Sequence, residues 1–166
     1  MNEPPKEPVK YVDSHVRLPY HYVAGDYRAR QLRAFKDKTI LGSKDSKTGN
    51  VFIPPIVNSP ASFAPCDEFV EVSDRGVVTT FCVVCIPVIG RDIELPYVAA
   101  SVALDGADIS IFAAIQECKP TDVRMGLRVA AVWKPDGERQ GNHEDILHFR
   151  PTGEPDAPMA SFINRL

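Results

Sequence analysis

The fold of this chain is decided by one stretch of sequence, Glu68-Phe-Val-Glu-Val-Ser-Asp-Arg-Gly76-Val-Val-Thr-Thr-Phe-Cys-Val-Val-Cys-Ile86. β-Branched and aromatic residues dominate it, as they dominate β-strands, and the polar Ser-Asp-Arg-Gly cluster divides it in two. Gly76 opens the longer half, where the strand of a small barrel would bend or bulge. The stretch therefore predicts two consecutive strands joined by a tight connection.

The same pattern continues along most of the chain. Alternating or β-branched runs recur as far as residue 149, separated by short connections rich in Gly, Asp and Pro. Several short strands with regular turn signals are typical of a closed barrel or a sandwich. The predicted strands cover residues 68–72, 76–87, 95–104, 108–116, 127–133 and 146–149.

One amphipathic helix is predicted ahead of the strands, over residues 27–36. Asp26 is a suitable N-cap for it. Its stripe, mostly apolar, consists of Tyr27, Gln31, Leu32 and Phe35. Arg28 falls beside this stripe, and the opposite side is basic, with Arg30, Arg33 and Lys36. There are two interpretations of the basic side. It is a solvated face, or the helix binds a partner subunit, since a lone amphipathic helix needs a surface on which to bury its apolar stripe.

Between the helix and the strands lie two serine pairs with the spacing of zinc-ribbon ligands: Ser43, Ser46, Ser59 and Ser62. The two-residue gap within each pair, with Gly49 after the first, is what two metal-binding knuckles need. A serine hydroxyl stays protonated near pH 7 and is a poor zinc donor. We therefore expect a zinc-ribbon remnant without zinc. Its serines would keep the turns by hydrogen bonding but would not tie the knuckles together, so that a partner surface would have to hold the segment.

The cysteines do not indicate a metal or redox site. Cys82 and Cys85 fall in the predicted strand 76–87, where residues three apart point to opposite faces, so their thiols cannot readily share an ion or a disulfide. We interpret both as small buried apolar residues. Cys66 follows the second serine pair, but one thiolate does not make a zinc site, and we expect it to be inert.

Bulk composition indicates a globular protein. The chain has 166 residues, 44% hydrophobic and 25% charged, and a formal net charge of −3. No apolar run approaches the ~20 residues of a membrane span. The N-terminus lacks the layout of a signal peptide, and we expect a cytoplasmic protein.

The residues also offer no catalytic constellation. No histidine lies near Cys82, Cys85 or Cys118 in the sequence to act as a base. The glycine-rich loops that cradle phosphates are absent. The histidines have no metal-ligand spacing: His15, His21, His143 and His148. We therefore expect no enzyme activity from the chain alone, which argues against a free-standing hydratase or thioesterase.

The order of the motifs along the chain is more specific than any one of them. Ser43-Lys-Asp-Ser46 is followed by Pro54-Pro55, Ser59-Pro60, Phe69-Val-Glu-Val-Ser73, Leu95-Pro-Tyr97, Gly126-Leu-Arg128 and Phe149-Arg-Pro151. In this order the chain resembles a family of small zinc-ribbon/OB-fold proteins associated with acyl-CoA enzymes. The likeness covers roughly residues 20–151, and the chain departs from the family at the four metal-ligand positions.

This resemblance implies a mainly β fold, with an N-terminal helix, a rubredoxin-like zinc-ribbon remnant and a five-stranded OB-fold barrel. The expected segments are an N-terminal arm and helix (1–38), the degenerate ribbon (39–66), the OB-fold domain (67–151) and a C-terminal tail (152–166). We expect the tail to dock on a partner.

The resemblance further implies a non-catalytic accessory subunit of a thiolase-like enzyme that acts on acyl-CoA, of the thiolase or steroid side-chain retro-aldolase type. It implies a heteromer with two copies of each subunit, an acyl-CoA site shared with the partner, and no tightly bound cofactor. Because CoA carries phosphates, the expected contacts are basic. They are Lys44, Lys47 and Arg91, with Tyr97 beside the pantetheine or acyl portion.

The alternative is a single-stranded nucleic-acid-binding OB-fold protein. Such proteins use a positively charged groove with stacking aromatic side chains. The acidic net charge and the scattered Lys and Arg residues argue against this use.

Overall fold

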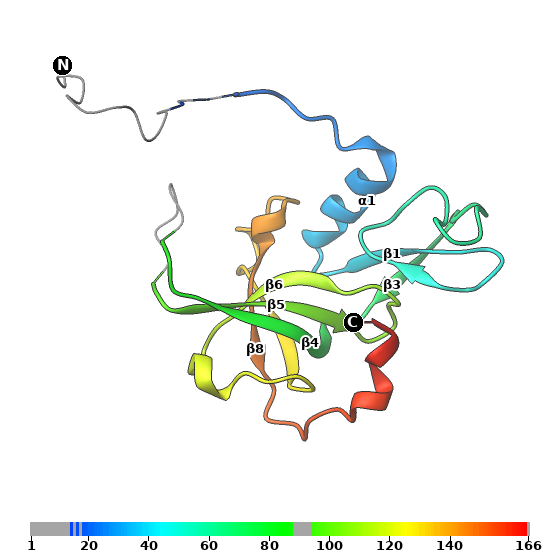
Figure 1. Ribbon diagram of the computed structural model, residues 1–166. Coiled ribbons are helices and arrows are strands. Elements are labelled where there is room, and N and C mark those ends of the chain that lie inside the picture. Colours follow the sequence, from blue (N-terminus) through cyan, green and yellow to red (C-terminus); the bar gives the residue numbers. More distant parts are fainter. Residues whose placement is uncertain (1–13, 15, 17, 88–93, 166) are drawn as a thin grey trace, which may run out of the picture.

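The computed structural model describes residues 14, 16, 18–87 and 94–165. Within these residues, one α-helix leads into a three-stranded sheet and then into a closed five-stranded barrel (Figure 1). The helix and the small sheet are α1 (Gly25–Phe35), β1 (Ile40–Lys44), β2 (Val51–Phe52) and β3 (Glu68–Val72). The barrel strands are β4 (Arg75–Val84), β5 (Tyr97–Leu104), β6 (Ile111–Ile115), β7 (Arg128–Trp133) and β8 (Ile146–Pro151).

The barrel has the strand order β4-β5-β6-β8-β7, and β7 pairs with β4 to close it. Every pairing is antiparallel except that of β6 with β8. A mainly β fold with a helix near the N-terminus and a five-stranded OB-fold barrel is therefore confirmed. A Cβ atom on Gly76 would lie 2.5 Å from the carbonyl oxygen of Ala103, and a bulge follows between Val78 and Thr80. Glycine is needed here because β4 and β5 approach too closely for a side chain.

One continuous core joins the barrel to the preceding segments. The barrel contributes the buried side chains of Val78, Val102 and Phe149. The same cluster includes Phe35 from α1 and Ile53 from the loop after β2. The expectation that a partner must hold the ribbon remnant is therefore wrong, because the ribbon shares a core with its own barrel.

The start of α1 also differs from the prediction. The N-cap is Ala24, which makes no side-chain hydrogen bond, and Asp26 lies inside the first turn. Its carboxylate accepts a hydrogen bond from Arg30 Nε at 3.0 Å. The stripe of the helix packs on its own chain: the ring of Tyr27 lies 4.9 Å from that of Phe69. The helix therefore needs no partner to bury this face.

The C-terminal segment folds onto the barrel instead of reaching toward a partner. It includes two short 3₁₀ turns, η3 (Met159–Ser161) and η4 (Ile163–Arg165). Phe162 is buried against Val77 and Ala103, on the outside of the barrel. The Arg165 guanidinium donates to the backbone carbonyls of Leu104 and Ala107. The expectation that this tail docks on a partner is wrong for the part that carries Phe162.

Cys82 and Cys85 are exposed, so their interpretation as buried residues is wrong. β4 pairs with β7 only as far as Val77, but with β5 as far as Val84. The end of β4, from Thr80, is therefore paired with β5 alone and forms an open edge of the barrel, and neither face of this end of β4 is fully covered. Both cysteines are free thiols, in agreement with the prediction that they form no disulfide.

Candidate functional site

The ribbon remnant is closed by hydrogen bonds centred on its serine pairs. The Ser43 side chain is fully buried, and its hydroxyl bonds to both backbone groups of Ile56. It donates to the carbonyl at 2.9 Å and accepts from the N–H at 2.9 Å. Ser59 is also buried, and its hydroxyl accepts from the N–H of Ser62 at 3.3 Å. Two former ligand positions thus satisfy the backbone of the second loop.

Asp45, which the sequence analysis did not single out, is the centre of this network. Its buried carboxylate accepts from the Ser62 hydroxyl at 2.6 Å and from the N–H groups of Lys47 and Thr48 at 2.7 and 3.1 Å. These hydrogen bonds, that from Ser62 foremost, hold the pKa of Asp45 well below its usual range. The bond to Ser62 joins the two knuckles, so the prediction that the serines leave them untied is wrong. An aspartate two residues before the Lys47 N–H is the local signal of an Asx turn.

The donor set of this site does not fit zinc. Ser46 is exposed, and its hydroxyl makes no hydrogen bond to the described residues. Burial raises the pKa of the Cys66 thiol, and the Asp45 carboxylate raises it further, which disfavours the thiolate that binds zinc. No cluster of three or more His, Cys, Asp or Glu side chains that could hold a metal is found in the described part of the chain. That the protein carries no zinc stays a prediction.

Of the described residues predicted to contact CoA, Tyr97 lies apart from Lys44 and Lys47. Lys44 and Lys47 both lie on the ribbon, where Lys44 forms an exposed ion pair with Glu68 at 3.2 Å. Tyr97 lies at the first residue of β5 and lines a groove of about 630 Å³. The far end of β5 leads to the ribbon, because the N–H of Asp108, four residues after β5, bonds to the carbonyl of Val51. Arg91 falls outside the described residues. The four contacts stay predictions.

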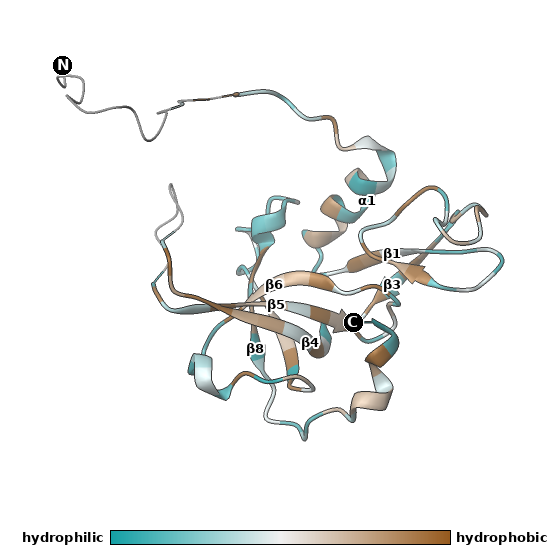
Figure 2. Cartoon of the chain, in the orientation of Figure 1, coloured by the Kyte–Doolittle hydropathy of each residue, from teal (hydrophilic) through white to brown (hydrophobic). Residues whose placement is uncertain are grey.

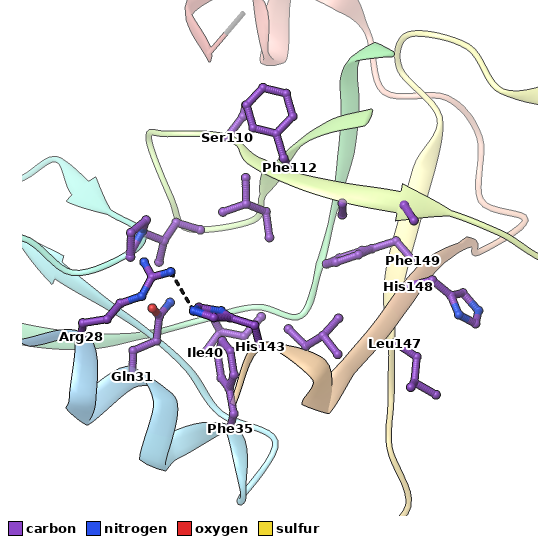
Figure 3. Close-up of a pocket in the computed structure, with 16 residues that line it drawn as sticks. Arg28, Gln31, Phe35, Ile40, Ser110, Phe112, His143, Leu147, His148 and Phe149 are labelled. Carbon is purple, nitrogen blue, oxygen red and sulfur yellow. Dashed lines mark hydrogen bonds between the residues drawn. The ribbon is translucent and has the colours of Figure 1, made fainter. Parts of the chain in front are cut away.

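A different cavity, of about 580 Å³, lies between α1, the loop after β2, β6 and β8 (Figure 3). Its apolar lining includes the buried side chains of Phe35, Ile40, Ile53 and Phe149. At its rim, Arg28 donates a hydrogen bond to His143 Nε2 at 3.0 Å. This contact requires a neutral His143, and burial, followed by the charge of Arg28, lowers the pKa of that imidazole.

A rigid turn holds His143 in place. Asn142 caps the short 3₁₀ helix η2 (His143–Asp145) and forms a capping box with Asp145. The Asp145 carboxylate is fully buried and accepts from the N–H groups of Gln140, Gly141 and Asn142 at 2.6–3.1 Å. Burial alone would raise the pKa of Asp145, but these N–H groups bring it below the usual value.

Gln31 is the unusual residue in this cavity. Only 5% of the residue is exposed, yet its amide makes no hydrogen bond to the described residues. Figure 3 shows the amide beside the Arg28 guanidinium, on the side of the helix that faces the cavity. A polar residue inside an otherwise apolar helical stripe was the sequence signal for this site. The arrangement can bind a ligand, but it presents no nucleophile.

The thiols of the barrel do not supply one either. Burial raises the pKa of Cys118, and the Asp122 carboxylate raises it further. His148 Nε2 contacts the Glu117 carboxylate at 2.9 Å. The raised pKa disfavours the reactive thiolate at Cys118.

The described residues form an OB-fold barrel preceded by a three-stranded sheet, whose strands and loops carry the two serine pairs. A family model described as the C-terminal OB-fold domain of ChsH2 matches residues 69–134. The DUF35 domain-containing scaffold protein of Methanocaldococcus jannaschii is 31% identical over 115 residues, which are 66% of this chain and 80% of that protein. This chain belongs to the DUF35 family.

Solved structures agree with this fold. An Ltp2-ChsH2(DUF35) aldolase aligns with a TM-score of 0.59 and 22% identity, over 76% of this chain and 95% of that one. A DUF35-family protein of unknown function from Sulfolobus solfataricus aligns with a TM-score of 0.51 and 18% identity, over 62% and 75%. At these identities, both show a shared fold.

Proposed function

We propose that this chain is a non-catalytic accessory subunit that binds a thiolase-like catalytic subunit and helps to form its acyl-CoA site. The observation that carries the proposal is the exposed apolar end of β4, which is paired with β5 alone and forms an open edge of the barrel. Phe81 is 38% exposed, Val83 44% and Ile86 76%. Figure 2 shows this end of β4 as a continuous hydrophobic strip. Contiguous exposed apolar side chains mark protein-binding surfaces in soluble proteins.

The relatives support an assembly role. The M. jannaschii protein is named a scaffold protein, and one structural neighbour is an aldolase of Ltp2 and ChsH2. No helix in the described ranges is long and apolar enough to cross a membrane. We propose a cytoplasmic heteromer with two copies of each subunit, without zinc or any tightly bound cofactor.

The acyl-CoA contacts are part of the same proposal. Lys47 is exposed on the first ribbon turn, and Lys44 is the last residue of β1, just before that turn. Two ammonium groups on one turn suit the phosphates of CoA. Arg91 and Tyr97 would then contact a second part of the ligand or the partner. The reacting groups would belong to the catalytic subunit, which could be a thiolase, a synthase or a retro-aldolase.

The test is co-expression with thiolase-like proteins encoded beside this chain. We expect a stable complex with acyl-CoA-dependent activity and no turnover by the isolated chain. A chain that stays monomeric beside every such protein contradicts the proposal. Salt-sensitive retention on single-stranded oligonucleotides would favour the nucleic-acid-binding alternative instead.

A pair of variants locates the interface. Phe81→Glu places a charge on the exposed apolar strip and should weaken complex formation about tenfold or more. Met159→Glu makes the same kind of change at an exposed apolar residue of the C-terminal segment and should leave the complex intact. Thermal unfolding of each isolated variant checks that the fold is retained. Equal binding by Phe81→Glu and the unmodified chain would remove this strip from the interface.

A further inference from the structure

We propose that the cavity beside α1 binds a small carboxylate with an apolar body, independently of any partner subunit. The first argument is its charge. Arg28 lines the cavity and forms no ion pair with a described residue, and no Asp or Glu is among the lining residues. Arg28 therefore supplies a positive charge at the rim of a cavity whose lining carries no carboxylate.

The second argument is the amide of Gln31. Among the described residues, no fully buried side-chain N or O atom lacks a hydrogen-bond partner. The amide of Gln31 bonds to none of them, so it is open to the cavity rather than sealed in the core. This amide is in a residue that is 95% buried, on the helix face that lines the cavity. It offers one NH₂ donor and one carbonyl acceptor. A ligand that enters the cavity can accept from the NH₂ group and so satisfy it.

The third argument concerns the geometry of the two donors. Gln31 lies three residues after Arg28, about one helical turn, so both side chains lie on one face of α1. One N–H group of the Arg28 guanidinium donates to His143, and its other N–H groups are available to donate to a ligand. A carboxylate matches the planar fork of a guanidinium, whereas a neutral alcohol does not.

The fourth argument is size and polarity. A volume of about 580 Å³ is within the range of small-molecule sites, which is roughly 300–1,000 Å³. Below the donors the floor is apolar, with Ile40, Ile53 and Phe149 buried against the barrel. The carboxylate would therefore lie at Arg28 and Gln31, and the apolar body would lie on this floor.

The chain carries its own reporter for binding. The ring of Phe35 lines the cavity and contacts the edge of Trp133 at 5.7 Å between centroids. Trp133 is the only tryptophan of the chain. Movement of Phe35 on ligand entry should therefore change the fluorescence of the protein.

The experiment titrates the isolated full chain with octanoate and, separately, with octan-1-ol, and follows the emission of Trp133. We expect saturable binding of octanoate that is about tenfold or more tighter than that of octan-1-ol. Arg28→Gln should weaken octanoate binding by about tenfold or more. Arg33→Gln is the matched control, because Arg33 is an exposed arginine of the same helix that does not line the cavity. It should leave binding unchanged.

Gln31→Leu tests the second donor. It should weaken octanoate binding several-fold while leaving the melting temperature equal or higher, because an apolar side chain of similar shape replaces an unpartnered amide. NMR adds a readout that a structural role would not move: the side-chain amide resonances of Gln31 should shift with octanoate in the unmodified chain. In Arg28→Gln the same shift should need an octanoate concentration about tenfold or more higher.

The proposal is overturned if octanoate and octan-1-ol bind equally, if no saturable binding occurs, or if Arg28→Gln binds octanoate as the unmodified chain does. None of these measurements uses CoA or a partner. Their failure would leave the proposed accessory function standing, and failure of complex formation would leave this site standing.

Discussion

Replacing Ser43 by alanine tests whether the former ligand positions now stabilise the ribbon by hydrogen bonding. The hydroxyl is fully buried and makes two bonds of 2.9 Å to the peptide groups of Ile56. A hydrogen bond contributes about 0.5–1.5 kcal/mol net, and a buried group left without its partner costs about 1–3 kcal/mol. Because Ile56 is half-buried, water would recover part of this loss. We expect Ser43→Ala to lower the free energy of unfolding by about 2–3 kcal/mol.

The matched control is Ser46→Ala, at the other position of the same serine pair. Ser46 is exposed and its hydroxyl has no partner among the described residues. The change should stay within about 0.5 kcal/mol of the unmodified chain. In a zinc ribbon the two positions would be equivalent ligands, so the difference between the variants separates hydrogen bonding from metal binding.

The assay is equilibrium unfolding in urea, followed by far-UV circular dichroism and by Trp133 fluorescence. Coincident transitions with an unchanged m-value would make the free energies comparable. For a chain of this size, the expected loss corresponds to a melting temperature lower by about 4–12 °C. Equal stability of Ser43→Ala and Ser46→Ala would refute the reasoning.

Three further predictions concern the ribbon and the tail. The pKa of Asp45 is lowered in the folded protein, so the stability that its carboxylate contributes is fully present above the unfolded pKa near 4 and is lost as the pH falls further. Asp45→Asn should therefore be less stable than the unmodified chain at pH 7, and the difference between their melting temperatures should narrow below about pH 4. A difference that stays constant with pH would contradict this linkage. A zinc chelator should leave the melting temperature unchanged, and elemental analysis should find no zinc; stoichiometric zinc would overturn our interpretation of the ribbon. Phe162→Ala should destabilise the protein by about 3 kcal/mol, because the ring is buried against Val77 and Ala103, while Met159→Ala, at an exposed neighbour, should not; equal melting temperatures would show that the tail adds no stability.

Much of the barrel could be predicted because its signal is local. Strand periodicity, β-branched residues and turn clusters depend on the residues themselves. They placed β4, β5 and β7 of the barrel, and β3 of the small sheet, close to their observed bounds. β6 is shorter than the predicted strand 108–116, because the backbone around Asp108 instead bonds to Val51 of the ribbon. A contact across so many residues leaves no local signal.

The candidate sites were harder to predict for the same reason. The serine pairs located the ribbon, but the residue that joins its two knuckles is Asp45, whose partner Ser62 lies in the other loop. Likewise, Arg28 and Gln31 became a site only because β6 and β8 close the cavity opposite them.

The sequence by itself determined the class of fold, the place of the ribbon and the family, since each depends on the order and spacing of residue types. Only the tertiary structure decided which segments cover which surfaces of the barrel. It placed the C-terminal segment on the barrel, left the end of β4 exposed, and joined the loops of the two serine pairs through Asp45 and Ser62. These outcomes depend on contacts between segments that are distant in the sequence. Such contacts form only when the whole chain packs, so no local pattern of residues encodes them.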